Sequence, residues 1–122
     1  MITGAGGLLG SQYTKDLISC GAIIVAIDNN IRKLTKLKKE VDNDRLLTIS
    51  GDITKDNDWK KIVSFTIKKY KKIDVLINSA ASKSKNLKDF FQKFETFKYK
   101  KWKEIMSVNV DGSYLLSQAV SK

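Results

Sequence analysis

Three glycines near the start of the sequence have the type and spacing of a phosphate-binding turn. Gly4, Gly7 and Gly10 follow a short apolar stretch and lead into a segment, residues 9–17, in which apolar side chains recur at helical spacing. Glycines between a strand and a helix let the backbone turn tightly and approach a pyrophosphate, while the helix N–H groups point at its oxygens. The pattern predicts a dinucleotide-binding turn that Leu9 helps to line. A glycine-rich turn without a ligand is the alternative.

An acidic residue follows where such a turn predicts one. Asp28 ends the continuous apolar run of residues 22–27, about 20 residues beyond the glycines. Its carboxylate can accept hydrogen bonds from both ribose hydroxyls of an adenosine, and its charge repels a 2′-phosphate. We therefore expect NAD as the cofactor, with NADP less favoured, and Asn29 beside Asp28 in the site. Arg32 and Lys33 weaken this discrimination, and the alternative role of Asp28 is to cap the next helix.

The composition excludes several other kinds of site. The sequence has no histidine, and Cys20 is its single cysteine, so an internal disulfide and a cysteine-based metal site are excluded and no metal is expected. The net charge of +10 raises nucleic-acid binding as an alternative. Most lysines, however, fall between apolar positions of predicted helices, which is typical of solvated faces. A single cysteine is typical of a reducing compartment, so we expect a cytoplasmic protein. No apolar run reaches the roughly 20 residues that span a membrane, so no membrane partner is expected.

Strands and helices alternate along the chain. Apolar runs predict strands at residues 2–4, 22–27, 46–51 and 73–77, with helices between them. The second helix is expected over residues 31–41, closed by Asn43 and Asp44. The third is expected to be capped by Thr54 or Asp56 and to bury an apolar stripe made of Trp59, Ile62, Val63, Ile67 and Tyr70.

Such alternation indicates right-handed βαβ units. The fold class is therefore α/β, a Rossmann-like, doubly wound parallel sheet of strand order 3-2-1-4, and residues 1–122 form one partial dinucleotide-binding domain. Residues 82–98 are expected to form a loop with a short helix. From Tyr99 onward the pattern predicts one long helix, disturbed near residues 109–112.

Four sequence elements, in this order, resemble the short-chain dehydrogenase/reductase family. The first is the Thr-Gly-rich turn. The second, Gly51-Asp52-Ile53, resembles the family's adenine contact, which implies that Asp52 reaches the exocyclic amine and the Ile53 backbone reads the ring. Asn78-Ser79-Ala80-Ala81 is similar to the family's Asn-Asn-Ala-Gly element, so Asn78 and Ala80 are expected to line the cofactor. The fourth, Val108-Asn109-Val110, resembles the catalytic asparagine segment, which implies that Asn109 holds a water of the proton relay.

Each later element also has a structural interpretation. Asp52 could be a turn residue or a helix cap, Asn78 an ordinary loop residue, and Asn109 a local hydrogen-bonding group within a helix. The commoner form of the family's first motif has a glycine where Leu8 stands. The segment of residues 82–103 has a weaker resemblance to family members linked to flagellin and surface-glycan modification, which implies a sugar-related substrate.

The resemblance implies hydride transfer between a nicotinamide and a carbonyl or secondary alcohol, by a full-length enzyme that is a homo-oligomer. Its catalytic tyrosine, the lysine one turn later and further strands are expected well beyond Asn109, so we expect a truncated chain that is inactive alone. Tyr99 and Lys103 have the required spacing but precede Asn109, and we expect them to be unrelated to catalysis. The alternative function is that of a non-catalytic dinucleotide-binding or regulatory protein.

Overall fold

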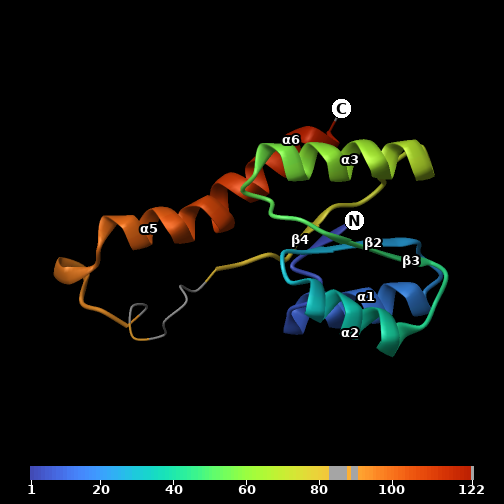
Figure 1. Ribbon diagram of the computed structural model, residues 1–122, viewed down its shortest axis with the longest axis horizontal. Helices are drawn as coiled ribbons and strands as arrows, with labels where there is room; N and C mark the ends of the chain where they lie inside the picture. Colours follow the sequence, from blue (N-terminus) through green and yellow to red (C-terminus); the bar gives the residue numbers. More distant parts are fainter. Residues whose placement is uncertain (83–87, 89–90, 122) are drawn as a thin grey trace.

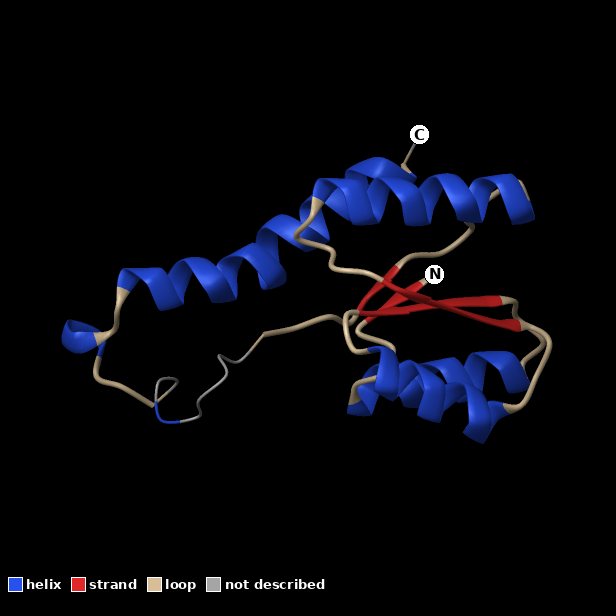
Figure 2. Ribbon diagram, viewed as in Figure 1, coloured by secondary structure: helices blue, strands red, loops and turns tan. Residues whose placement is uncertain are grey.

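A parallel sheet lies between two helical layers in the computed structural model, which describes residues 1–82, 88 and 91–121 (Figures 1 and 2). Helices α1 (Leu8–Ser19) and α2 (Ile31–Val41) cover one face of the sheet. Helices α3 (Asp56–Tyr70) and α6 (Ser113–Val120) cover the other. Helix α5 (Tyr99–Met106) extends away from the sheet, preceded by a 3₁₀ turn at Phe94–Thr96. This arrangement confirms the α/β, Rossmann-like prediction.

The four strands follow the predicted order, β3-β2-β1-β4, and every pair is parallel. They comprise β1 (Ile2–Thr3), β2 (Ile24–Asp28), β3 (Leu46–Ser50) and β4 (Ile77–Asn78). The fourth strand was predicted over residues 73–77, and that length is wrong. A strand needs a hydrogen-bonded neighbour, and β1 offers only Ile2 and Thr3, which pair with Ile77 and Asn78.

Helix α2 occupies the predicted residues, but two details of the helices differ. Asp42, in the left-handed conformation, ends α2, so Asn43 and Asp44 lie beyond its cap. Neither Thr54 nor Asp56 caps α3. The Thr54 hydroxyl donates to Asp52 instead, and Asp56 is already helical. Lys55 is the N-cap, and its ammonium, which has no acceptor atom, makes no capping bond.

The core lies on both faces of the sheet. On one face Ile2, Ala26 and Leu34 are fully buried with the neighbouring apolar residues of α1 and α2. On the other, Val25 and Ile27 of β2 pack in one cluster with Ile62 of α3 and Leu116 of α6. The predicted stripe of α3 is wrong at Ile67, which is exposed. Thr66 is buried in its place, and its hydroxyl is satisfied there because it donates to the Ile62 carbonyl at 2.8 Å.

Charged residues lie on the surface, and the lysines of α2 and α3 are exposed, as expected for solvated faces. Lys15 of α1 and Glu40 of α2 form an ion pair at 2.7 Å that joins the two helices. The hydrogen bond from Lys15 lowers the pKa of Glu40.

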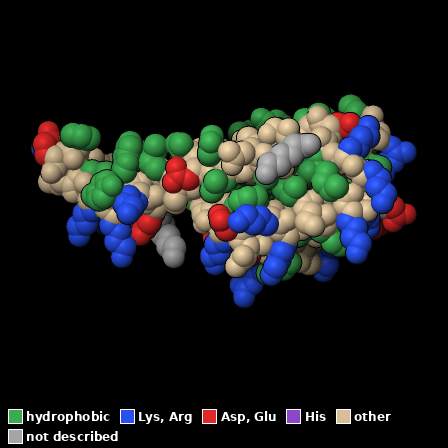
Figure 3. Space-filling view, turned by 90° about the horizontal axis from the view of Figure 1, so that it is seen from above, with side chains coloured by type: hydrophobic (Ala, Val, Ile, Leu, Met, Phe, Trp, Pro, Cys, Tyr) green, Lys and Arg blue, Asp and Glu red, His purple; other side chains and the backbone are tan. Residues whose placement is uncertain are grey.

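Figure 3 shows apolar side chains along the α5 arm, where Tyr99 and Trp102 are exposed. Within the described ranges, no helix has the length and apolar character needed to cross a membrane.

The segment leading into β4 forms an apolar edge of the sheet. Val75 precedes β4, one of the two edge strands of the sheet, and the residue is 61% exposed. Exposed apolar strand edges pair with other chains, and lysine placed there discourages this pairing. Val75→Lys is therefore expected to increase the monodisperse fraction of this chain, measured by size-exclusion chromatography with light scattering. Ser64→Lys adds the same charge to the exposed surface of α3, and an equal improvement from it would contradict a specific role of the edge.

Candidate functional site

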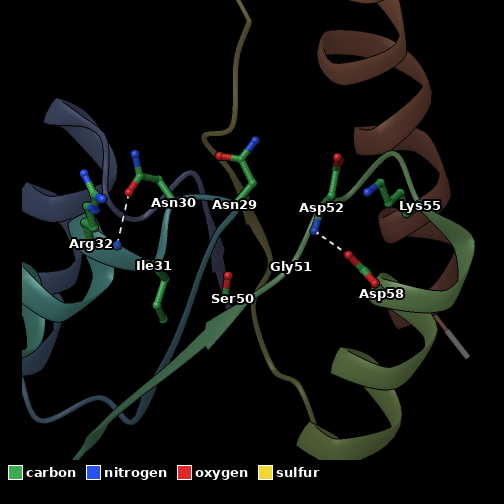
Figure 4. Close-up of a pocket in the computed structure, with 9 residues that line it drawn as sticks. All are labelled: Asn29, Asn30, Ile31, Arg32, Ser50, Gly51, Asp52, Lys55 and Asp58. Atoms are coloured by element: carbon green, nitrogen blue, oxygen red, sulfur yellow. Dashed lines mark hydrogen bonds between the residues drawn. The ribbon is translucent and has the colours of Figure 1, made fainter.

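A cleft of about 540 Å³ lies at the carboxyl ends of the strands. The glycine turn after β1 and the residues that follow β2, β3 and β4 line it. The lining residues include Gly4, Gly7, Leu9, Gly10, Asp28, Asn29, Asp52, Ile53 and Ala80. A second cavity, drawn in Figure 4, adjoins this cleft and shares Asn29, Gly51 and Asp52 with it. The strand order reverses beside β1, and ligands of open α/β sheets bind at this kind of crevice.

The glycine turn depends on the absence of side chains. Gly4 has a φ of +62°, and a Cβ on it would lie 2.7 Å from the Ala80 Cα. A Cβ on Gly10 would overlap the Gly4 carbonyl oxygen and lie 2.8 Å from the Ala5 Cα. Glycine at these two positions therefore lets α1 and the loop after β4 both approach the end of β1.

The amino end of α1 opens directly from this turn. Gly7 is its N-cap and supplies no capping side chain, and the first turn of α1 carries no acidic residue. The first N–H groups of a helix lack partners within the helix, and together with the helix dipole they favour an anion. Because the turn lines the cleft, this end of α1 is placed to receive the oxygens of a phosphate.

The Asp28 carboxylate is fixed by two backbone groups. Its Oδ2 accepts a hydrogen bond from the Gly6 N–H at 3.0 Å, and its Oδ1 accepts one from the Asn30 N–H at 2.9 Å. The alternative in which Asp28 caps the next helix is wrong. The Asn30 side chain caps α2 instead, accepting from the N–H groups of Arg32 and Lys33 at 3.1 and 3.3 Å. The carboxylate therefore keeps one orientation, at the end of β2 and within the cleft.

Asp52 organises the turn after β3. Its Oδ1 accepts hydrogen bonds from the Thr54 N–H at 2.9 Å and the Thr54 hydroxyl at 2.7 Å. Its own N–H donates to Asp58 of α3 at 3.0 Å, as Figure 4 shows. The turn interpretation of Asp52 is confirmed, while the residue also lines both cavities. Ile53 is buried and packs beside Gly112.

A buried threonine that the sequence analysis did not assign to the site joins the glycine turn to β4. The hydroxyl oxygen of Thr3 accepts hydrogen bonds from the Ser79 and Ala80 N–H groups, each at 3.2 Å. Asn78 does not line the cleft, and its amide donates to the hydroxyl of Ser117 on α6 at 3.0 Å. A hydroxyl residue next to the glycines was the only sequence signal for the role of Thr3, because its partners lie far along the chain.

Asn109 lies in a π-helical turn, Ser107–Gly112, between α5 and α6, so the predicted disturbance of the long helix is confirmed. Its Oδ1 accepts from the Ser82 N–H at 2.7 Å, and its Nδ2 donates to the Ser82 carbonyl at 3.3 Å. Asn109 is exposed and does not line the cleft, whereas its neighbour Val108 does.

Within the described part of the chain, no group of His, Cys, Asp or Glu residues could hold a metal ion.

A family model for short chain dehydrogenases matches residues 1–122 of the chain. The chain belongs to the short chain dehydrogenase family. A curated relative, the NAD-dependent glycerol dehydrogenase of Listeria innocua, is 29% identical over all of this chain and 45% of its own length. NAD(P) is the cofactor of the family, which makes this cleft the candidate cofactor site.

Solved structures of family members superimpose closely on this chain. The 3-ketoacyl-(acyl-carrier-protein) reductase of Brucella melitensis, complexed with NADH, is 30% identical with a TM-score of 0.85, covering 96% of this chain and 46% of that one. NAD⁺-bound xylitol dehydrogenase is 25% identical with the same TM-score of 0.85, covering 98% and 45%. The chain thus spans about half the length of the relatives that it matches.

Proposed function

We propose that this chain is the NAD-binding portion of an oxidoreductase, with residues 1–122 forming one partial dinucleotide-binding domain. The observation that carries the proposal is the uncapped amino end of α1, which opens from a glycine turn into a cleft that also holds the oriented carboxylate of Asp28. The turn suits a pyrophosphate, and the carboxylate suits a pair of ribose hydroxyls. Both groups occur together in one dinucleotide.

The remaining residues suit a cofactor laid across the cleft. Asn29 lines it beside Asp28, and Asp52 and Ile53 line the side where an adenine would lie. On the other side, Ala80 and Leu9 line the cleft where a nicotinamide ring would lie, and Asn78 steadies the loop after β4 through Ser117. We propose NAD in preference to NADP because the Asp28 carboxylate would repel a 2′-phosphate.

The reaction proposed for the whole enzyme is hydride transfer between the nicotinamide and a carbonyl or secondary alcohol. The cofactor supplies the hydride chemistry, and this chain's residues bind and orient it. We propose that Asn109 acts on the proton relay only in the whole enzyme, since here it holds Ser82 outside the cleft lining. We also propose that the whole enzyme is a homo-oligomer and that its substrate is a small molecule of the carbonyl or alcohol class, which includes sugar derivatives.

The pair Tyr99 and Lys103 does not serve as the catalytic pair in this proposal. Both lie on α5, where the Lys103 ammonium stands 5.7 Å from the centre of the Tyr99 ring. Neither lines the cofactor cleft, and Tyr99 is 72% exposed. Among the described residues that line the cleft there is no tyrosine. A dinucleotide-binding protein without catalysis of its own stays the second candidate.

A fluorescence titration of this chain with NADH and NADPH tests the proposal. We expect saturable enhancement or quenching with NADH, a weaker response to NADPH, and competition by adenosine 5′-monophosphate. The absence of binding to both dinucleotides would overturn the proposal. Turnover of alcohols by this chain with NAD⁺ would reject the second candidate, a protein without catalysis.

A further inference from the structure

An apolar cavity of about 470 Å³ lies at the amino ends of the strands, opposite the cofactor cleft. Ile2 of β1 pairs with Ala26 on one side and with Ile77 on the other. β2 begins two residues before Ala26, at Ile24, and the segment that leads into β4 likewise precedes Ile77. Both therefore extend past the amino end of β1, and both line the cavity. The cavity occupies the path that a longer central strand would follow.

Each helical layer covers one side of this path. Leu17 of α1 lines the cavity from one face of the sheet, and Tyr70 of α3 lines it from the other. The side chains of β2 alternate between the two layers, because Ile24 packs in the cluster with Leu17 and Val25 in the cluster with Tyr70. A parallel strand that is covered on both faces carries apolar side chains at consecutive positions. The surroundings therefore suit an extended segment of consecutive apolar residues.

The Met1 ammonium stands where the path meets β1. One of its three N–H groups donates to the Val75 carbonyl at 2.8 Å, which is the one hydrogen bond that it makes among the described residues. Burial lowers the pKa of this ammonium below its usual value, and the Asp74 charge acts in the opposite direction. Asp74 is itself paired with Lys72 at 2.8 Å. A carboxylate that arrived along the path would therefore meet a partly buried cation with N–H groups to donate.

We propose that this cavity is a peptide-binding groove, which takes an extended apolar peptide parallel to β2 with its free carboxylate against the Met1 ammonium. The peptide and β1 then form the central strand together, and backbone hydrogen bonds to the neighbouring segments supply affinity. Ile23 and Val75 line the groove and are exposed, so a peptide reaches it from solvent. The groove lies at the opposite ends of the strands from the cofactor cleft, and the inference does not rest on the proposed function.

The tetrapeptide acetyl-Lys-Ile-Val-Val with a free carboxylate tests the inference. Its three apolar residues match the path, and its lysine stays in solvent. Titration into the ¹⁵N-labelled chain should give saturable shifts in the amide signals of Ile24, Val25 and Val75, while those of Gly7 and Ala80 in the cofactor cleft stay unchanged. The same peptide with a carboxyl-terminal amide is the matched control. It should bind about five- to tenfold more weakly, because the charge-assisted bond to Met1 is lost.

A chain that carries Lys-Ile-Val-Val joined before Met1 gives a second readout. The added residues should fill the groove covalently, raise the melting temperature by about 5 °C or more, and abolish the shifts caused by the free peptide. A chain extended by Lys-Gly-Asn-Gly is its control, with the same length and the same lysine. It should melt no higher than the chain itself, because it places no apolar side chain in the groove.

Four results would overturn the inference. They are the absence of saturable shifts at millimolar peptide, equal binding of the free acid and the amide, shifts confined to α5, and equal melting temperatures of the two extended chains. Movement of the Ile24 and Val25 signals on raising the protein concentration without peptide would identify a second copy of the chain as the occupant, which also contradicts the proposal. NADH titration of the same sample reports on the cofactor cleft separately, so failure at one site is distinguishable from failure at the other.

Discussion

Replacing Gly4 with alanine is expected to lower the free energy of unfolding by about 3–5 kcal/mol, the sum of backbone strain and overpacking. The strain arises because φ at Gly4 is +62°, where a side chain is unfavourable. The overpacking arises because the new Cβ would lie 2.7–2.8 Å from backbone atoms of Ser79 and Ala80. Those backbone atoms are held by the Thr3 hydroxyl and cannot move aside freely. Urea unfolding followed by circular dichroism measures the loss.

Gly21→Ala is the matched control for this prediction. Gly21 also has a positive φ, +89°, but its Cβ would meet only the far end of the Arg45 side chain, at 3.1 Å. It therefore carries the strain without the backbone collision, and we expect a loss of about 1–2 kcal/mol. Equal losses in the two variants would contradict the claim that the loop after β4 packs directly on the glycine turn.

Asp28→Ala is expected to weaken NADH binding about ten- to a hundredfold, because hydrogen bonds from ribose hydroxyls to a charged carboxylate are lost. The substitution also frees the Gly6 and Asn30 N–H groups that the carboxylate holds. Part of the effect will therefore come from a less ordered turn. NADPH binding should weaken less, because the repulsion of the 2′-phosphate disappears at the same time.

Asp44→Ala provides the control for charge. Asp44 is exposed and lies outside the cofactor cleft, so its removal changes the net charge equally without touching the site. Fluorescence titration with both dinucleotides compares the variants, and circular dichroism checks their folding. If Asp28→Ala and Asp44→Ala bound NADH equally, Asp28 would not hold the ribose.

Local patterns were sufficient to predict much of this molecule. The residues of α2 follow from apolar periodicity, which is encoded over a few adjacent residues. The strand order follows from the alternation of strands and helices together with the right-handed βαβ rule. The glycine turn and Asp28 were predicted to meet because consecutive parallel strands bring their carboxyl ends to one edge of a sheet, and both line the cleft.

Features that depend on distant partners were not predictable. The length of β4 is set by its pairing with β1, and the burial of Thr66 in place of Ile67 is set by how α3 rests on the sheet. The Thr3 hydroxyl finds its donors at Ser79 and Ala80, and Asn109 finds its partner at Ser82. Spacing along the sequence carries no information on such contacts until the topology is known.

The central claim is that the carboxyl edge of this sheet binds a nicotinamide dinucleotide, and amide NMR of the ¹⁵N-labelled chain during NADH titration tests it most directly. We predict shifts in the amide signals of Gly7, Leu9 and Ala80, which line the cleft. Signals from Ile23 and Val75, which line an apolar cavity at the opposite ends of the strands, should not move. Unchanged spectra, or shifts confined to Ile23, Val75 and their neighbours, would contradict the claim.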